Sequence, residues 1–176
     1  KVSYASGKTI DTLFKSNTTD LKEEVEGYEF SEDENLIVLS TESEAIYRHS
    51  TKANHHIYNR KTGSLVPVSE KGKQQYATLD ASGKSVAFVR DNNLYLKSLT
   101  NGIEKPITTD GSRKSIINGA TDWVYEEEFS FDQGYQWSPN GRYLAYYRFD
   151  ESAVRQFNLT YYTSGSYPKE ELYKYP

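Results

Sequence analysis

Three segments of the chain repeat one pattern, in which an apolar residue is followed by a polar turn and then by a short apolar strand. These segments are residues 30–39, 79–88 and 137–146, and they begin 49 and 58 residues apart. The turns of the second and third segments contain Ser82-Gly83 and Asn140-Gly141. Such pairs suit turn positions that need a positive φ angle. The pattern therefore predicts three equivalent strand–turn–strand units.

A second unit follows the first two segments, because residues 57–63 resemble residues 94–102. Each of these stretches has the composition of a strand that ends in a tight turn. One full unit is then roughly 40 to 60 residues of short strands, which is the period of a β-propeller blade. Helical periodicity is weak, and one short helix is expected around Thr121 to Glu128. We therefore predict an all-β fold of radially arranged, mostly four-stranded antiparallel blades.

The number of repeats is small for a propeller. We count about two whole blades and parts of two others, whereas a closed ring typically needs 4–8 blades. The chain also begins at Lys1 and contains no Met. We therefore interpret residues 1–176 as an incomplete propeller domain from the interior of a longer protein.

Composition narrows the possible functions. The 16 Tyr, 7 Phe and 2 Trp residues supply enough apolar area for a core, although 26% of the residues are charged. No cysteine is present, so disulfides and thiol chemistry are excluded. The net charge is −4 and Lys and Arg occur at most in pairs, which argues against a nucleic-acid partner. No stretch reaches the roughly 18 apolar residues of a membrane span, so none is expected in this chain.

The most unusual chemistry lies in residues 122–129, where Glu126, Glu127 and Glu128 are flanked by aromatic residues. A bare acidic run is usually a solvated surface feature. Here Trp123 and Phe129 should anchor the segment against the fold. Crowded carboxylates repel one another, so a fold that holds them together needs a metal, an arginine or a ligand ammonium nearby. A metal is the weaker choice because no ladder of Asp and Asn ligands surrounds the run, and no cofactor is expected.

These motifs resemble the dipeptidyl peptidase IV family. The resemblance rests on the acidic segment at residues 122–128, on the following segment at residues 137–146, and on Tyr47-Arg48-His49-Ser50 upstream. Members of that family join an eight-bladed propeller to an α/β-hydrolase domain with a Ser-Asp-His triad. They cleave after a proline or alanine in the second position of a peptide. The resemblance implies that this chain is part of such a propeller, with the Glu motif on a short helical segment and the hydrolase domain absent.

The resemblance also assigns substrate-binding roles. It implies that Glu127 and Glu128 bind the free amino terminus of a peptide, that Arg48 binds a substrate carbonyl, and that Glu126 faces a structural partner. Charge-assisted hydrogen bonds to an ammonium are roughly twice as strong as neutral ones, which agrees with this assignment. Adjacent residues in a regular helix or strand point apart, so we expect an irregular turn that brings the glutamates together. The competing interpretation of Arg48 is an ordinary surface ion pair.

Catalytic residues are not found in this chain. The sequence has no Gly-x-Ser-x-Gly elbow, and the three histidines, His49, His55 and His56, are expected to occupy two surface positions and one turn. The chain alone should therefore be inactive. Two alternatives stay open: the propeller of a prolyl tripeptidyl peptidase, and a non-enzymatic, protein-binding propeller. Arg48 beside the glutamate pair favours the dipeptidyl enzyme.

The resemblance further implies partners and a location. The partners are a peptide with a free amino terminus, the protein's own C-terminal hydrolase domain and a second copy of the protein. The homodimer would use the Tyr-rich segment from Phe157 to Tyr175 as part of an arm. The lack of cysteine favours a bacterial protein that is periplasmic, exposed on the cell surface or secreted.

Overall fold

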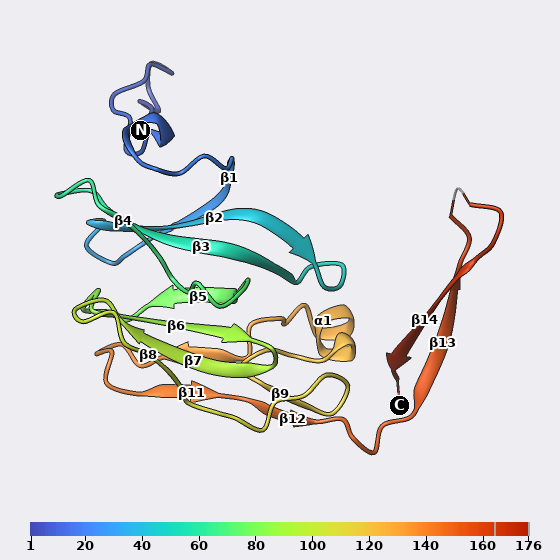
Figure 1. Cartoon of the computed structure of the whole chain (residues 1–176). Helices are drawn as coiled ribbons and strands as arrows, with labels where there is room; N and C mark the ends of the chain where they lie inside the picture. Colours follow the sequence, from blue (N-terminus) through green and yellow to red (C-terminus); the bar gives the residue numbers. More distant parts are fainter. Residues whose placement is uncertain (164, 176) are drawn as a thin grey trace.

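The fold consists of three stacked layers of antiparallel strands, with a hairpin projecting to one side (Figure 1). The computed structural model describes residues 1–163 and 165–175. The first layer is a four-stranded sheet in the order β1 (Val25–Phe30), β2 (Leu36–Ala45), β3 (Thr51–Asn59) and β4 (Leu65–Pro67). The second is a four-stranded sheet in the order β5 (Gln75–Leu79), β6 (Ser85–Arg90), β7 (Asn93–Ser98) and β8 (Glu104–Pro106). Each sheet is a simple up-and-down meander, the form of a propeller blade.

The sequence repeats fall on equivalent turns of these layers. Each repeat is the hairpin between the first and second strands of its layer. Its fifth position, occupied by Glu34, Gly83 and Gly141, has a φ angle of 55°, 64° and 66°. The second repeated unit is the hairpin between the third and fourth strands of the first two layers. The prediction of equivalent strand–turn–strand units is therefore confirmed.

The third layer has an interrupted strand. It contains β9 (Ile116–Asn118), β10 (Tyr135–Trp137), β11 (Leu144–Tyr146) and β12 (Arg148–Asp150). β10 pairs with β11 and β9 pairs with β12, and only Tyr147 separates β11 from β12. β9 and β10 thus act as two halves of a single strand that runs beside β11 and β12. Residues 119–134, between the two halves, form an insertion that leaves the layer. This insertion carries the helix α1 (Trp123–Phe129).

Four residues, Gly119, Ala120, Gln133 and Gly134, form the neck of the insertion. Ala120 pairs with Gln133 in an antiparallel bridge, and the Gly134 amide donates to the Gly119 carbonyl at 3.0 Å. Tyr147 closes the base, since its amide donates to Gly134 and its carbonyl accepts from Gly119. The backbone hydrogen bonds of the interrupted strand are thus largely satisfied inside the insertion, so the excursion leaves few groups unpaired.

The core lies between the layers, and β6 is buried on both of its faces. Val86 and Phe88 pack against the first layer, whereas Ala87 and Val89 pack against the third. Successive side chains of a strand point to opposite faces, so one strand of continuous apolar residues contributes to both interfaces. The described residues form no closed ring, and the expectation of eight blades stays a prediction. The same holds for the interpretation of residues 1–176 as an incomplete propeller domain.

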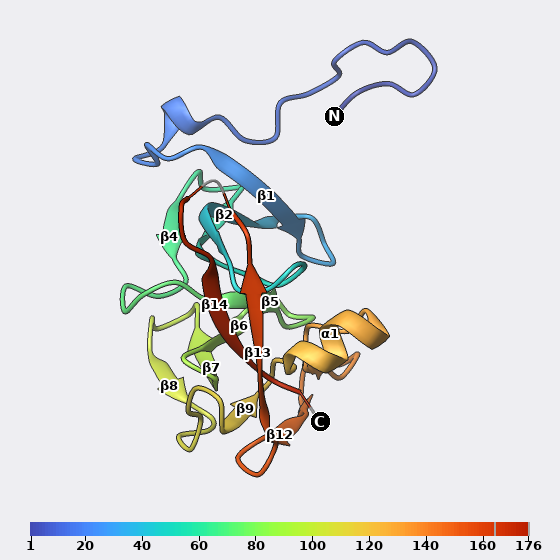
Figure 2. The ribbon, with the colours of Figure 1, turned by 90° about the vertical axis from the view of Figure 1, so that its right-hand side faces the viewer.

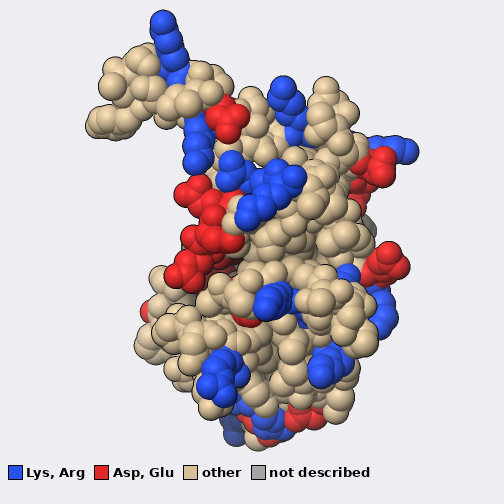
Figure 3. Space-filling model, turned by 90° about the vertical axis from the view of Figure 1, so that its left-hand side faces the viewer, with Lys and Arg blue, Asp and Glu red and all other residues tan. Residues whose placement is uncertain are grey.

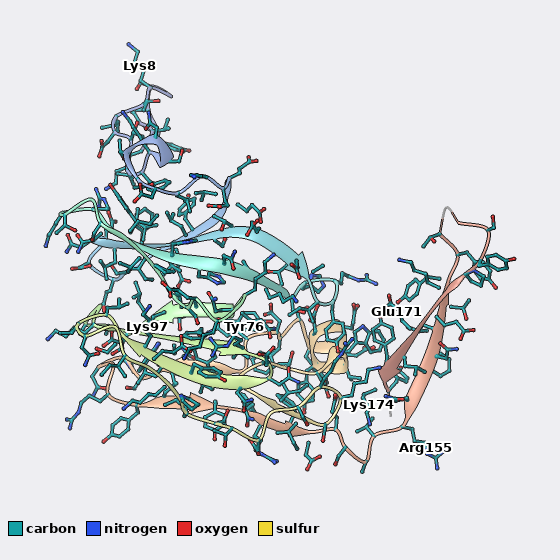
Figure 4. The ribbon with its side chains drawn as sticks, viewed as in Figure 1. Lys8, Tyr76, Lys97, Arg155, Glu171 and Lys174 are labelled. Atoms are coloured by element: carbon teal, nitrogen blue, oxygen red, sulfur yellow. The ribbon has the colours of Figure 1, made fainter. Side chains whose placement is uncertain are left out.

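Two segments extend beyond the stacked layers, the projecting hairpin to one side in Figure 1 and the N-terminal segment at the top of both views (Figure 1 and Figure 2). The first is the N-terminal segment, residues 1–24, which contains a short 3₁₀ helix at Ser16–Thr18. The second is a hairpin of β13 (Gln156–Tyr161) and β14 (Lys169–Lys174), which we call the arm. In Figure 4, Arg155 lies at the foot of the arm and Lys174 lies on its inner side near α1. Lys174 Nζ donates to the Val154 carbonyl at 2.8 Å and so ties the end of β14 back to the foot.

Charged side chains are mixed over the face opposite the arm. Lys and Arg residues occur there singly or in small groups among uncharged atoms, with acidic residues nearby (Figure 3). Among the described residues, no helix is long and apolar enough to cross a membrane.

Candidate functional site

The helix α1 is short and has a defined beginning and end. Asp122 caps it, because its Oδ1 accepts from the Tyr125 amide at 2.9 Å. Aspartate is among the best residues at this position, where backbone amides lack partners. Ser130 ends the helix in a left-handed conformation, with φ 51°. The predicted helix around Thr121 to Glu128 is therefore confirmed, but the irregular turn is wrong. Since the helix is regular, the three glutamates lie about 100° apart around its axis.

The second part of the site is the loop between β2 and β3, residues 46–50, which we call the Arg48 loop. The Ile46 amide donates to the Ser50 carbonyl at 2.9 Å and closes the base of the loop. Arg48 therefore lies at the tip of a tight connection between two long paired strands. A short loop on a rigid sheet is a favourable place for a binding residue.

Arg48 and Glu127 lie together across the two elements. Arg48 Nε is 3.3 Å from Glu127 Oε1, although 79 positions separate the residues in the sequence. The side chain of Glu127 is only 18% exposed, whereas that of Arg48 is 73% exposed. The guanidinium is therefore accessible from solvent, while the carboxylate is held against the fold. Glu128 follows on the exposed side of the helix.

Glu126 points in a different direction and is only 2% exposed. Its Oε1 accepts hydrogen bonds from the amides of His49 at 2.6 Å and Ser50 at 3.0 Å. Glu126 therefore has a structural partner, as the resemblance implied. Its partner is the backbone that directly follows Arg48.

The formal charges of Glu127, Glu128 and Arg48 sum to −1, so one further cation would neutralise the site. Glu127 and Glu128 carry two formal negative charges, and Arg48 offsets one of them. A ligand ammonium would complete the balance and could donate up to three hydrogen bonds. Among the described residues, no cluster of three or more His, Asp and Glu side chains has the arrangement of a metal site.

Aromatic rings pack the arm against both parts of the site. The ring centroid of Tyr173 lies 5.1 Å from that of Trp123 and 6.0 Å from that of Tyr47. Tyr175 also packs on Trp123, at 5.5 Å. Burial and then the nearby carboxylates, of which Glu151 has the largest effect, raise the pKa of Tyr47 to about 12. The Tyr47 hydroxyl therefore stays neutral at physiological pH.

The flanking aromatic residues behave differently from each other. Trp123 is half-buried against the arm, which agrees with its expected anchoring role. Phe129 is 66% exposed, so the expectation that it anchors the segment is wrong. Tyr125 provides an anchor instead, since its ring lies 4.8 Å from that of Phe149 on β12. Tyr125 lies against β12, and the ring of Phe129, one turn later on the same helix face, contacts only Tyr125 among the aromatic rings of the described residues, at 5.3 Å, and stays exposed.

A cavity of about 260 Å³ lies beside the site, between the inner strands of the first two layers and the insertion. His49, His55, Tyr76 and Asp132 are among its lining residues, and Tyr76 lies on the α1 side of β5 in Figure 4. Burial lowers the pKa of His55 to about 4 and also lowers the pKa of His56. The turn position expected for one histidine fits His49, but the expected surface positions are wrong. His55 and His56 are half-buried on β3, because the second layer packs on one face of this strand and the N-terminal segment packs on the other.

Sequence reasoning missed the neck of the insertion and the two amides that bind Glu126. Gly119 and Gly134 are the sequence features that could have indicated the neck, because glycine permits unusual backbone angles and close backbone contacts. Gly119 has a φ angle of +77°, and a Cβ atom at Gly134 would lie 2.7 Å from the Ala120 carbonyl oxygen. The amides of His49 and Ser50 gave no signal, because every residue except proline carries one.

Fold and site together are consistent with part of a β-propeller, in which an arginine and a glutamate of separate elements meet. Residues 31–176 match the model of the dipeptidyl peptidase IV N-terminal region. This chain belongs to the dipeptidyl peptidase IV family, to whose N-terminal region it corresponds.

Individual relatives agree with this assignment. The chain is 40% identical over 157 residues to dipeptidyl peptidase 4 of Trichophyton rubrum, a match that covers 85% of this chain and 20% of that protein. It is 33% identical over 163 residues to prolyl endopeptidase FAP of Bos taurus, covering 92% and 21% respectively. The crystal structure of Porphyromonas gingivalis dipeptidyl peptidase 4 matches with 42% identity and a TM-score of 0.89, covering 99% of this chain and 25% of that one. The chain thus spans about a fifth of the length of its curated relatives.

Proposed function

We propose that this chain is the substrate-recognition part of a serine-type dipeptidyl peptidase that removes N-terminal dipeptides with Pro or Ala in the second position. Glu127 and Glu128 bind the α-ammonium of the peptide, and Arg48 binds its first carbonyl. The observation that carries this proposal is the 3.3 Å contact between Arg48 and Glu127, formed by two separate elements of a chain in this family.

The chemistry of an amino terminus fits this arrangement. An α-ammonium offers three donors, and carboxylates are its strongest acceptors. Arg48 presents several N–H groups in a planar fork, which suits a backbone carbonyl, and it also offsets part of the carboxylate charge. A peptide with an acetylated terminus would leave the carboxylates without their cation. The site therefore selects free amino termini.

The proposed role in catalysis is positioning. Binding the amino terminus at Glu127 and Glu128 places the second peptide bond at a fixed distance from the site. A nucleophilic serine in a C-terminal α/β-hydrolase domain of the same protein would attack there. Orientation of this kind can lower a barrier by several kcal/mol, roughly 7–11 in the best intramolecular cases. The present chain is proposed to be inactive alone.

The assembly and location are also proposals. The arm exposes large rings, including Phe157, Tyr162 and Tyr167, and aromatic residues are enriched in protein interfaces. We propose that it contributes to a homodimer of the full-length protein. A periplasmic, cell-surface or secreted location agrees with a peptidase that acts on external peptides.

The test uses the full-length enzyme and release of the chromophore from a Gly-Pro-anilide. Glu127→Gln and Glu128→Gln should each lower kcat/KM by about 30- to 1,000-fold, which corresponds to about 2–4 kcal/mol for removing one partner of a charged contact that the bound peptide would bury. Glu32→Gln, at an exposed position in the β1–β2 turn, is the matched control and should leave kcat/KM unchanged. Cleavage of a tripeptide anilide, compared with Gly-Pro-anilide, measures whether the enzyme removes tripeptides in preference to dipeptides.

A second reagent separates binding from folding. A small phosphonate that reacts with the serine but has no amine should inactivate the parent and both variants at the same rate. If the variants cleave Gly-Pro-anilide as fast as the parent does, the glutamates do not bind substrate and the proposal is wrong.

A further inference from the structure

Glu126, the first of the three consecutive glutamates, joins the two halves of the site. We infer that Glu126 is a positioning residue, whose carboxylate fixes the Arg48 loop to α1 before a peptide arrives. This inference rests on the proposed function, because it concerns how Arg48 and Glu127 are held for the same substrate.

The first argument is the pattern of contacts. Among the hydrogen bonds and ion pairs of the described residues, three join the Arg48 loop to the insertion at residues 119–134. One is the ion pair of Arg48 with Glu127, and the other two end on the same atom, Glu126 Oε1. Their donors are the amides of His49 and Ser50, the two residues that follow Arg48. Glu126 therefore fixes the backbone from which the Arg48 side chain extends.

The second argument is the weakness of the direct ion pair. The side chain of Arg48 is 73% exposed, and exposed ion pairs gain little because water screens them and long side chains lose freedom. Such a contact cannot hold a loop in place by itself. Hydrogen bonds from amides to a buried carboxylate are shorter and stronger than neutral ones, which suits them to that task.

The third argument is the cost of burying Glu126. A carboxylate that is 2% exposed loses most of its hydration, and within the described part of the chain no Lys, Arg or His side chain lies within ion-pair distance of it. An apolar residue would cover the same helix face without this cost. A carboxylate at this position is therefore explained by its two acceptor bonds to the loop.

The position on the helix makes the arrangement specific. Glu126 and Glu127 are adjacent, so one turn of α1 points one carboxylate inward to the loop backbone and the next toward the loop side chain. A displacement of about 1 Å can cost roughly 100-fold in rate when it misplaces a substrate-binding group. Loosening the contact at Glu126 should thus reduce recognition of the amino terminus even though Glu126 does not touch the substrate.

The experiment uses the full-length enzyme with Glu126→Leu, Glu126→Gln and the control Thr121→Val. Thr121 is 8% exposed and its hydroxyl donates to the Phe131 carbonyl within the insertion, so its removal weakens the insertion without touching the Arg48 loop. The readouts are hydrogen exchange of the peptide containing His49 and Ser50, kcat and KM for Gly-Pro-anilide, and the inactivation rate with the amine-free phosphonate.

We expect Glu126→Leu to speed exchange at His49 and Ser50 by about tenfold or more, because their acceptor is gone. Its kcat/KM should fall by about 10- to 100-fold, while the phosphonate rate stays at the parental value. Glu126→Gln keeps an oxygen acceptor and should recover most of both losses. Adding Arg48→Ala to Glu126→Leu should cause less further loss than Arg48→Ala causes in the parent, because the two residues act together.

Two results would overturn the inference. One is parental exchange at His49 and Ser50 in Glu126→Leu. The other is an equal loss of activity in Thr121→Val, or an equal loss toward the phosphonate, since either would make Glu126 a general stabilising residue. If Glu126→Leu does not fold, Glu126→Asp replaces it, because a carboxylate one methylene shorter should no longer reach both amides, and parental exchange at His49 and Ser50 in that variant would equally overturn the inference. Parental activity of Glu127→Gln and Arg48→Ala would instead refute the proposed function, and exchange would still report whether Glu126 holds the loop.

Discussion

Tyr173, near the end of the arm, packs its ring 5.1 Å from that of Trp123, the first residue of the helix that carries the glutamates. The same ring lies 6.0 Å from Tyr47, the residue before Arg48. One side chain of the arm therefore contacts both elements of the candidate site. Aromatic pairs contribute about 0.5–1.5 kcal/mol beyond the area they bury. The arm should thus stabilise the relative position of the Arg48 loop and α1.

The first prediction concerns this contact. In the full-length enzyme, Tyr173→Ala should lower kcat/KM for Gly-Pro-anilide by about tenfold, because α1 and the Arg48 loop lose a shared packing partner. The phosphonate without an amine should still react at the parental rate. Tyr143→Ala, at a 69% exposed position in the β10–β11 turn, is the control and should change neither rate. A parental kcat/KM for Tyr173→Ala would show that the arm does not support the site.

The second prediction concerns pH and His55. Burial lowers the pKa of His55 from 6.5 to about 4 in the folded chain. The folded state therefore keeps this side chain neutral, whereas the unfolded chain binds a proton below about pH 6.5. Because the unfolded state binds more protons, stability falls as pH falls from about 6.5 toward 4. The contribution of His55 to this loss between pH 7 and pH 5 is about 2 kcal/mol.

Thermal unfolding of the full-length protein at pH 7 and pH 5 measures this effect. His55→Gln should reduce the difference in midpoint between the two pH values. His49→Gln, at an exposed position in the Arg48 loop, is the matched control for replacing a histidine outside the core. An unchanged difference in His55→Gln would mean that other groups cause the acid sensitivity.

The third prediction concerns the arm as an interface. Tyr162 is 87% exposed and Tyr167 is 85% exposed, and neither lies against the layers. If the arm forms the proposed homodimer, replacing both with lysine should convert the full-length protein from dimer to monomer in sedimentation at micromolar concentration. The control is Tyr4→Lys, at an exposed position in the N-terminal segment, which should leave a dimer. A monomer in the parent protein would refute the dimer outright.

The sequence predicted the blades well because their signals are local. Each repeat contains both its turn and its strands, and positive φ angles at Gly83 and Gly141 follow from residue type. The short helix was also predictable, since Asp122 is a strong cap. The split strand of the third layer was not predicted, because the pairing of β9 with β12 joins segments 30 residues apart. Nothing in the local pattern of residues 116–118 distinguishes half of a strand from a short loop.

The site was predicted in part for a similar reason. A run of glutamates flanked by aromatic residues is unusual enough to be noticed in a sequence. Glu127, Glu128 and Arg48 could therefore be named from the sequence and the resemblance. Their roles in binding stay predictions. The partner of Glu126 could not be named, because it consists of backbone amides at His49 and Ser50 whose position depends on the fold. Burial of His55 was likewise missed, since it depends on how two layers stack.

The last prediction concerns the neck that lets α1 leave the third layer. A Cβ atom at Gly134 would lie 2.7 Å from the Ala120 carbonyl oxygen, closer than real Cβ contacts allow, and 3.0 Å from the Ala120 carbonyl carbon and nitrogen. The Gly134→Ala variant must therefore push the two sides of the neck apart and tilt the insertion. We expect kcat/KM for Gly-Pro-anilide in the full-length enzyme to fall by about tenfold or more, with the phosphonate rate retained, because Glu127 moves relative to Arg48. Gly102→Ala is the control: Gly102 has a positive φ angle of +73°, so an alanine there is strained, but nothing lies within 4 Å of its added Cβ. That variant should lose about 1 kcal/mol of stability and no activity. Equal activities for the two variants would show that the neck does not determine where α1 places its glutamates.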